Sequence, residues 1–236
     1  MHRPFLTAEW RWLAMLNYEI DPEVLKPFVP PGTELDSFNK ITYVSVVGFL
    51  FLRTRVFGLP IPFHRNFEEV NLRFYVRRKC GDEWRRGVVF IRELVPRALI
   101  AQVARTVYHE PYLAVPMRHQ IKSDVAGIEC EYAWQRAGRW ESLAASATGE
   151  SITTDDNSEE AFITEHYWGY TAHRGRTSEY QVEHPKWRVW RAQKTSFDAD
   201  VKTLYGEQFI APLARPPRSA FIADGSPVIV RTKSML

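Results

Sequence analysis

The regular alternation of apolar and polar residues over residues 69–77 constrains the fold more than any other feature of this chain. The apolar side chains that would share one face are Val70, Leu72, Phe74 and Val76. Alternation with a period of two indicates a β-strand, because successive side chains of a strand point to opposite sides of a sheet. The residues between them would face a second environment. A sheet with two different faces is typical of antiparallel architecture.

Strand patterns recur along the chain, whereas helical spacing is confined to short segments. The further strand or hairpin segments are residues 41–52, 87–95, 127–134 with 139–148, 168–173 with 178–183, and 220–223 with 228–231. Asp224-Gly225 is a two-residue hairpin signal between the last two segments. The helical segments are residues 22–28, 96–109 and 159–166. We therefore expect a single α+β domain over residues 1–236, built on a mainly antiparallel curved sheet with a few short helices.

The composition favours a cavity in a protein of the cytoplasm. Eight Trp, ten Tyr and fourteen Phe make the chain rich in side chains that form strands and line pockets. No apolar run approaches the ~18 residues of a spanning helix, and the N-terminus lacks the apolar core of a signal peptide. With only two cysteines, we expect a reduced cytoplasmic protein with free thiols and no membrane partner.

The motifs give little support for a metal site or a nucleic-acid surface. The seven histidines form no HExxH motif, and the two cysteines form no CxxC motif. Residues 184–194 interleave basic residues with Trp187 and Trp190, as a platform for single-stranded nucleic acid would. The same pattern describes a sheet edge with tryptophan inward and arginine outward, and a net charge of +3 does not favour nucleic acid. We expect no metal, no organic cofactor and no nucleic-acid partner.

Three long segments carry a family resemblance. They are residues 63–78 (FHRNFEEVNLRFYVRR), residues 87–119 (GVVFIRELVPRALIAQVARTVYHEPYLAVPMRH) and residues 162–187 (FITEHYWGYTAHRGRTSEYQVEHPKW). Together they resemble the YqjF-like family of conserved bacterial proteins of unknown function. The resemblance extends over nearly the whole chain in order, and it implies no established activity.

A more distant resemblance connects the chain with acetoacetate decarboxylase. It rests on the order Asp21-Pro22-Glu23, Pro30-Pro31-Gly32 and Phe67-Glu68-Glu69, followed by a helix and a loop. The resemblance implies an antiparallel β-cone that encloses an apolar cavity. The Schiff-base lysine of that family lies in a Pro-Lys-Lys sequence, which matches Pro116-Met117-Arg118 here. A Schiff base needs a primary amine, which neither methionine nor arginine supplies, so decarboxylation by that route is not expected.

Glu69 and Arg118 are the two site residues that the resemblance singles out. Glu69 matches the family glutamate that points into the cavity, where it would act as a general base with a raised pKa or as a partner for a bound cation. The alternative is a solvent-facing carboxylate paired with Arg73. Arg118 could clamp a substrate carboxylate, or it could pair with Glu69 or Glu110 for structural reasons. We predict that Glu69 and Arg118 share one cavity and that Arg118 keeps Glu69 ionised.

The polar loop at residues 107–119 and the loop before residue 67 supply the other candidates. His109 could be an acid–base group, although a histidine also sits well at a helix C-terminus for structural reasons alone. Tyr112 would act as a phenol donor beside the pocket. The predicted catalytic residues are Glu69, Arg118, Tyr112 and His109, and the predicted substrate-binding residues are His64, Arg73 and Met117.

Two functions agree with these residues. The first is a cofactor-free lyase, hydratase or isomerase that acts on a small carbonyl or carboxylate compound by acid–base chemistry. The second is a non-catalytic ligand-binding or sensor protein that uses the same apolar cavity. A purely structural or partner-binding protein is a third possibility, and the presence of an enclosed pocket would count against it.

Overall fold

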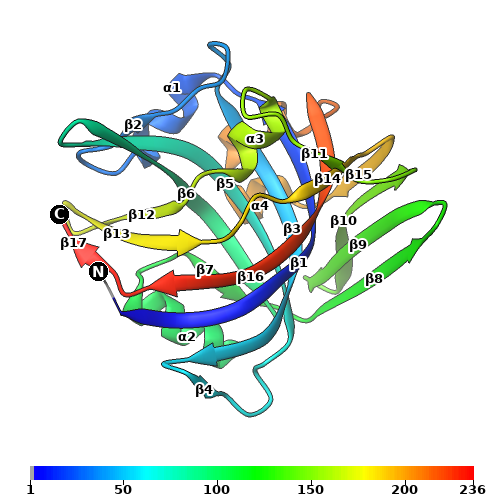
Figure 1. Cartoon of the computed structure of the whole chain (residues 1–236), viewed down its shortest axis with the longest axis horizontal. Coiled ribbons are helices and arrows are strands. Elements are labelled where there is room, and N and C mark those ends of the chain that lie inside the picture. The colour runs from blue at the N-terminus through cyan, green and yellow to red at the C-terminus, as the bar shows by residue number, and fades with distance from the viewer. Residues whose placement is uncertain (1–2) are drawn as a thin grey trace.

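Two β-sheets make up most of the molecule, with short helices between their strands (Figure 1). The computed structural model describes residues 3–236, without the side chains of residues 103–105 and 107. The strands of the larger sheet are β1 (Pro4–Glu19), β2 (Glu34–Leu35), β3 (Tyr43–Val56), β4 (Leu59–Pro60), β5 (Phe67–Cys80), β6 (Glu83–Val95), β7 (Tyr112–Ala114), β11 (Ile152–Thr153), β12 (Trp168–His173), β13 (Arg176–Glu183), β14 (Arg188–Arg191), β16 (Ser219–Arg231) and β17 (Ser234–Met235). The strands of the smaller sheet are β8 (Met117–Asp124), β9 (Gly127–Arg136), β10 (Arg139–Thr148) and β15 (Lys194–Asp198).

The helices are short and lie between strands or at the ends of the sheets. The α-helices are α1 (Pro22–Leu25), α2 (Ala98–Val107), α3 (Glu159–Thr164), α4 (Val201–Tyr205) and α5 (Ile210–Leu213), and the 3-10 helices are η1 (Lys26–Phe28) and η2 (Glu207–Phe209). The three predicted helical segments correspond to α1 with η1, to α2 and to α3. No helix among residues 3–236 is both long and apolar enough to cross a membrane.

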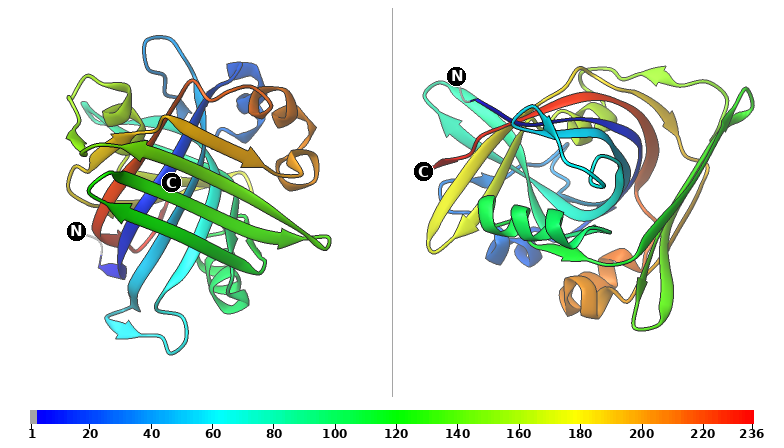
Figure 2. Two further views of the ribbon diagram at one scale, coloured as in Figure 1. Left: turned by 90° about the vertical axis from the view of Figure 1, so that its right-hand side faces the viewer. Right: turned by 90° about the horizontal axis from the view of Figure 1, so that it is seen from below.

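The larger sheet closes on itself into a cone. Its strands follow the order β16-β1-β3-β5-β6-β12-β13, and β13 pairs again with β16, with Val182 opposite Val230. Neighbouring strands of this ring are antiparallel except for β6 and β12, so the sheet is mixed but largely antiparallel. The predicted antiparallel pairing of β5 with β6 is confirmed, with Phe74 opposite Val89. Seen from below, the long strands curve round one another and α2 lies across one end (Figure 2).

Irregularities in three long strands bend the sheet. Trp12 in β1 has a φ of 58° and Arg53 in β3 has a φ of 55°, and the register between β1 and β3 shifts at both places. In β6 an extra residue lies opposite the step from Leu72 to Arg73 in β5. Such a bulge increases the local twist and moves the side chains that follow it to the other face of the sheet. The curvature of the cone therefore depends on local backbone geometry as well as on the apolar pattern.

The predicted hairpin at Asp224-Gly225 is wrong, because β16 continues through it as one strand. Gly225 does have the positive φ, 76°, that a hairpin turn requires. It uses this conformation inside a strand, where a Cβ atom would lie 2.0 Å from the carbonyl oxygen of Trp10 in β1. The Asp-Gly pattern thus marks a positive φ correctly, but a bend within a strand needs the same conformation as a chain reversal.

A closely packed hydrophobic core lies against the outer face of the cone. The smaller sheet covers this face and crosses the long strands at a steep angle (Figure 2). The fully buried β5 side chains between the two sheets are those predicted from the alternation, Val70, Leu72, Phe74 and Val76. Gly48 permits the close approach of the sheets, since a Cβ atom there would lie 2.6 Å from the ring of Tyr132. The outer face is therefore filled, and any ligand space must lie on the inner face.

Candidate functional site

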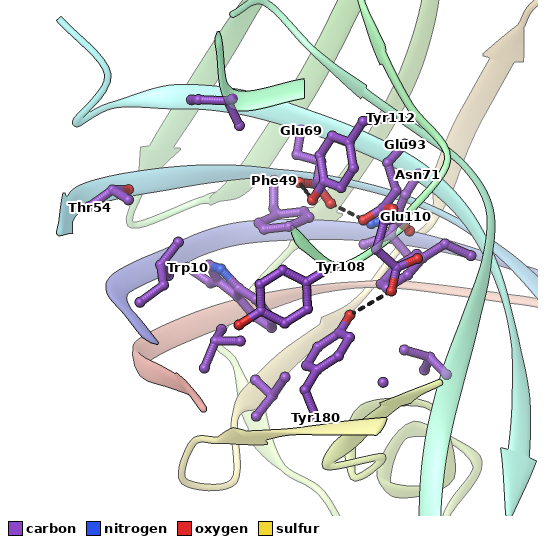
Figure 3. Close-up of a pocket in the computed structure, with 18 of the residues that line it drawn as sticks. Trp10, Phe49, Thr54, Glu69, Asn71, Glu93, Tyr108, Glu110, Tyr112 and Tyr180 are labelled. Atoms are coloured by element: carbon purple, nitrogen blue, oxygen red, sulfur yellow. Dashed lines mark hydrogen bonds between the residues drawn. The ribbon is translucent and has the colours of Figure 1, made fainter. Parts of the chain in front are cut away.

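A cavity of about 280 Å³ lies inside the cone and is lined mainly by apolar and aromatic side chains (Figure 3). Trp10 of β1 and Phe49 of β3 form part of one wall, and Tyr108 and Tyr180 form part of another. Leu99 of α2 lines the cavity and is also 52% exposed, which places it at the rim. A volume of this size is at the lower end of the range of small-molecule sites in proteins. The cavity therefore fits a small, largely apolar compound.

The strand irregularities determine which side chains face this cavity. Trp10 and Leu13 both line it although they are three residues apart, because the irregularity at Trp12 lies between them. Phe90 and Glu93 of β6 also both line it, because the extra residue of the bulge lies between them. Side chains three residues apart in a regular strand would point to opposite faces. The β6 bulge therefore points the carboxyl group of Glu93 toward the interior of the cavity.

Glu69 is the first of three buried carboxyl side chains at the polar end of the cavity. It lies on β5, and only 3% of the residue is exposed. The Asn71 amide donates to Glu69 Oε1 at 3.0 Å, and the Tyr112 hydroxyl donates to Oε2 at 2.9 Å. Burial raises the pKa of Glu69 to about 7, although both hydrogen bonds and the charge of Arg73 act in the opposite direction. Glu69 therefore exchanges its proton near neutral pH.

Glu93 and Glu110 complete this group, which we call the carboxyl cluster (Glu69, Glu93 and Glu110). Glu93 lies opposite Tyr112 in the parallel pairing of β6 with β7. Glu110 follows α2, and its Oε1 accepts hydrogen bonds from the Thr171 hydroxyl at 2.6 Å and the Tyr180 hydroxyl at 3.2 Å. Burial raises the pKa of Glu110 to about 8 and that of Glu93 well above its usual value, and neighbouring carboxyl charges add to both effects.

The carboxyl cluster has the properties of an acid–base site. Three carboxylates cannot all ionise in a buried site, because each charge loses its hydration and repels the next. Their pKa values therefore separate, and groups with separated pKa values near neutrality can serve as proton acceptor and proton donor in one reaction. Glu69, with the lower pKa of about 7, fits the acceptor, and Glu110, with a pKa of about 8, fits the donor.

Arg73 is the arginine among the residues that line the cavity. Its Nη2 donates to the carbonyl oxygen of Ile163 at 3.2 Å, and its guanidinium lies 5.7 Å from the centre of the Tyr75 ring. Arg73 Nε is buried and has no hydrogen-bond partner among the described residues. Arg73 therefore offers one unused donor to the cavity while its charge acts on Glu69.

Four of the seven predicted site residues line this cavity. They are Glu69, Arg73, Tyr112 and His64. Glu69 and Tyr112 are hydrogen-bonded to each other, as described above. His64 lies in the loop before β5, and its Nδ1 is 2.7 Å from the carbonyl oxygen of Pro62. The structure brings these four side chains to one cavity, and their catalytic or binding roles stay predictions.

The prediction that Arg118 shares the cavity with Glu69 needs correction. Arg118 is exposed on β8 of the smaller sheet, and its guanidinium lies 4.1 Å from the centre of the Trp140 ring. The smaller sheet covers the outer face of the cone, so Arg118 does not line the cavity. The pKa of Glu69 is accordingly raised by burial and not lowered by Arg118. Because the prediction relied on a distant resemblance, it located Arg118 along the chain without determining the face it occupies.

His109 and Met117 also lie outside the set of residues that line the cavity. His109 has a positive φ of 61° after α2, and its ring stacks on that of His173 with 3.7 Å between centres. Met117 is half-buried at the start of β8 and packs against the core between the sheets. The residues of this loop that line the cavity are Tyr108, Glu110 and Tyr112, and Glu110 directly follows His109.

Sequence reasoning missed Glu93 and considered Glu110 only as a partner for Arg118. A signal for Glu93 does exist, because it is a single acidic residue within the strand-forming segment 87–95, and buried carboxyl groups are rare without a special reason. The bulge that directs Glu93 inward has no comparable signal. Glu110 likewise depends on the backbone turn at His109, which the sequence pattern does not reveal.

Comparison with known proteins establishes the family. Residues 7–227 match the DUF2071 family, which is described as an uncharacterized conserved protein. This chain belongs to the DUF2071 family. The uncharacterized protein YqjF of Bacillus subtilis strain 168 is 28% identical over 188 residues, which cover 78% of this chain and 74% of that protein. The predicted resemblance to the YqjF-like family is confirmed.

Solved structures confirm the acetoacetate decarboxylase-like fold. The enduracididine biosynthesis enzyme MppR complexed with pyruvate has a TM-score of 0.70 and 15% identity, and the match covers 100% of this chain and 91% of that chain. Acetoacetate decarboxylase from Legionella pneumophila has a TM-score of 0.68 and 11% identity, with 100% and 88% of the two chains covered. An acetoacetate decarboxylase-like enzyme from Sphingomonas wittichii RW1 has a TM-score of 0.66 and 13% identity, with 99% and 94% covered. At these identities the likeness establishes the fold alone.

Proposed function

We propose that this protein binds a small carbonyl compound inside the cone and transfers protons to and from it without an organic cofactor. The observation that supports this proposal most strongly is the carboxyl cluster at the polar end of an apolar cavity. Proton removal next to a carbonyl group is the first step of many lyase, hydratase and isomerase reactions. The apolar walls would hold the body of the compound and exclude water from the reacting atoms.

Glu69 is the general base in this proposal, and Glu110 is the general acid. The ionised Glu69 carboxylate takes a proton from the carbon next to the carbonyl group, and the electron pair of that C–H bond forms a C=C bond. The carbonyl oxygen meanwhile receives the proton of neutral Glu110, which gives an enol and leaves Glu69 neutral and Glu110 ionised. The pKa values of about 7 and about 8 suit these roles at neutral pH. Tyr112 holds Glu69 in place through its 2.9 Å hydrogen bond and is a positioning residue.

A covalent route through a Schiff base is not part of this proposal. That route needs an amine in the cavity, and none of the residues that line it is a lysine. Met117, at the position that the resemblance matches to the family nucleophile, lies outside the lining residues. We expect borohydride treatment in the presence of pyruvate to leave the mass of the protein unchanged. A lysine adduct detected by mass spectrometry would contradict this part of the proposal.

Deuterium exchange tests the proton transfer directly. Pyruvate, 2-butanone and phenylacetone are incubated with the protein in D₂O, and the loss of the α-proton signal is followed by NMR. We expect at least one of them to exchange faster than in buffer and the Glu69→Gln variant to reduce this acceleration by about 10²–10⁴-fold. Glu34→Gln is the matched control, because Glu34 is exposed and pairs with Arg77 away from the cavity. Exchange that the Glu69→Gln variant leaves unchanged would overturn the assignment of the base.

A non-catalytic binder or sensor is the second candidate, and the predominantly apolar lining of the cavity favours it. Such a protein would retain a small molecule through purification, which native mass spectrometry detects as an added mass. The two candidates differ in one result. A ligand that binds without any α-proton exchange supports the binder, whereas exchange that depends on Glu69 supports the enzyme.

A further inference from the structure

The carboxyl cluster and the neighbouring Asn71 contain hydrogen-bond acceptors that none of the described residues satisfies. Glu93 Oε2, Glu110 Oε2 and Asn71 Oδ1 are buried and have no hydrogen-bond partner in this part of the chain. All three residues line the cavity, and at most 4% of each residue is exposed. An unpaired buried acceptor destabilises the fold, and more so when it is charged. The three acceptors therefore lie where a bound molecule can supply the missing donors (Figure 3).

Three other buried glutamate or aspartate residues of the described chain have donors for their carboxyl groups. Asp36 accepts from Arg86 at 2.8 Å and lies 3.2 Å from the His166 ring nitrogen. Glu179 accepts from two arginines, at 2.6 and 3.2 Å. Glu141 accepts from the Trp134 indole at 2.6 Å and from a backbone amide at 3.1 Å. Outside the cavity Glu165 Oε1 is also buried without a hydrogen bond, but it lies 3.5 Å from the Lys186 ammonium group, a counter-charge that Glu93 Oε2 and Glu110 Oε2 lack among the described residues.

Few positive charges face the carboxyl cluster. Arg73 of β5 acts on Glu69, and Lys233, after β16, acts on Glu110. Arg73 Nη2 donates its hydrogen bond to the backbone carbonyl group of Ile163 and not to the cluster. The other titratable groups that face Glu93 and Glu110 are hydroxyls of tyrosines, from Tyr108 after α2, Tyr112 of β7 and Tyr180 of β13. Among the described residues, the cluster therefore has less counter-charge than its carboxyl groups would need to ionise together.

The surrounding aromatic rings would also attract a positively charged ligand group. Trp10, Phe49, Tyr108, Tyr112 and Tyr180 all line the cavity beside the cluster. The faces of aromatic rings carry partial negative charge and attract cations, most strongly where water is excluded. The cavity thus has carboxyl groups at one end and aromatic rings along its walls. This combination suits a ligand that carries a positively charged nitrogen on an apolar body.

We propose that the ligand of this cavity carries a basic nitrogen, as an amine or guanidine does, and donates its N–H groups to Glu93. This inference rests on the proposed function in placing the ligand in the same cavity, and it adds the substrate class. The carbonyl group of such a compound would lie between Glu69 and Glu110, and the nitrogen would lie beside Glu93, whose Oε2 atom has no hydrogen-bond partner among the described residues. Binding the cation lets a carboxyl group ionise, so a proton leaves for the solvent as the ligand enters.

Matched probes that differ only in charge test this inference. Benzylamine, 2-phenylethylamine and 3-phenylpropylamine are compared with the alcohols and carboxylates of the same chain length by isothermal titration calorimetry at pH 7. We expect at least one amine to bind ten-fold or more tightly than its alcohol, and each carboxylate to bind more weakly than its alcohol. Repeating the titration in buffers with different ionisation enthalpies should show that the amine, but not the alcohol, releases a proton on binding.

Variants of the cluster locate the effect. Glu93→Gln keeps the shape of the side chain but cannot ionise, so it should reduce the preference for the amine ten-fold or more and decrease the proton release. Glu34→Gln should change neither quantity, because Glu34 is exposed and pairs with Arg77. Circular dichroism shows whether Glu93→Gln folds, and if it does not, the amine preference and the proton release of the wild type decide the result.

Two results would overturn the inference. One is that no amine of the series binds better than its alcohol, and the other is that an amine preference persists unchanged in Glu93→Gln. These failures are distinguishable from failure of the proposed function. If α-proton exchange of 2-butanone depends on Glu69 while no amine is preferred, only the basic-nitrogen inference is wrong. If amines bind and no carbonyl compound exchanges its protons, the inference holds and the proton-transfer proposal fails.

Discussion

The two faces of strand β5 lie in different environments, although their side chains alternate along the same stretch of chain. The outward side chains Val70, Leu72 and Phe74 are fully buried between two sheets and contain no polar atom. The inward side chains Glu69 and Asn71 are also buried, but they face a cavity, and Asn71 Oδ1 has no hydrogen-bond partner among the described residues. Burial alone therefore does not identify a core. The difference lies in whether the space opposite a side chain is filled by the protein or left for a ligand.

Truncating one phenylalanine on each face should give the largest effect and the clearest contrast. Phe74→Ala removes a fully buried ring from the closed core, so we expect it to lower the free energy of unfolding by about 3–5 kcal/mol. Phe90→Ala removes a partly exposed ring that lines the cavity, and the loss should be less than half as large. Urea denaturation followed by tryptophan fluorescence measures both. Equal losses would mean that the inner face is packed as tightly as the outer one.

The contrast between the two faces should also appear in how the free energy of unfolding depends on pH, because Glu69 lies on the inner face. Its pKa is about 7 in the folded protein and near the ordinary value of 4.5 when unfolded, so the folded state binds more protons between these values. Glu69 therefore stabilises the fold fully below about pH 4.5, and this contribution is lost as the pH rises through 7. Relative to Glu69→Gln, the wild type should lose on the order of 3 kcal/mol between pH 4.5 and 8.

Comparison with the Gln variant isolates Glu69 from other titrating groups. His166 has its pKa lowered by burial to about 4, so its contribution decreases as the pH falls below its ordinary value of 6.5, which is the opposite sign. That contribution is present in both proteins and cancels in the difference. A difference that stays constant from pH 4.5 to 8 would show that Glu69 keeps an ordinary pKa.

Replacing Arg118 should have the smallest effect. Arg118→Ala removes an exposed guanidinium stacked on Trp140, which typically contributes about 0.5–1 kcal/mol, and it should leave the titration of Glu69 unchanged. Arg73→Met is the contrasting variant, because the charge of Arg73 lowers the pKa of Glu69 and its removal should raise that pKa further. A shift of the Glu69 titration in Arg118→Ala, with none in Arg73→Met, would reverse the assignment of the two faces.

The sequence could predict the outer face of the cone better than its inner face. Alternation over residues 69–77 predicts the strand and both sets of side chains, because a filled core requires continuous apolar residues at regular spacing. The inner face depends on positions where this regularity is interrupted. The bulge in β6 directs Glu93 inward, and the positive φ of His109 precedes Glu110. Neither feature has a residue pattern of its own.

The errors have the same physical origin. Asp224-Gly225 indicates a positive φ, and the structure uses that conformation to bend β16 and not to reverse the chain. Arg118 was assigned to the cavity because of its place along the chain, and the smaller sheet then carries it to the outside of the cone. Local geometry and the packing of one sheet on another determine these outcomes, and both depend on contacts between residues far apart in the sequence.

Site-specific titration of the glutamate side chains tests most directly whether the cavity keeps a protonated carboxyl cluster at neutral pH. The chain is labelled with ¹³C at the glutamate side-chain carboxyl carbons, and NMR spectra are recorded from pH 4 to 9, with signals assigned through the Gln variants of Glu69, Glu93 and Glu110. We expect Glu69 to titrate near pH 7, Glu110 near pH 8 and Glu93 well above the ordinary range of a glutamate. If all three cluster carboxyls titrate with the exposed ones between about pH 4 and 5, the cavity does not hold a protonated carboxyl cluster, and both the acid–base role and its physical basis are wrong.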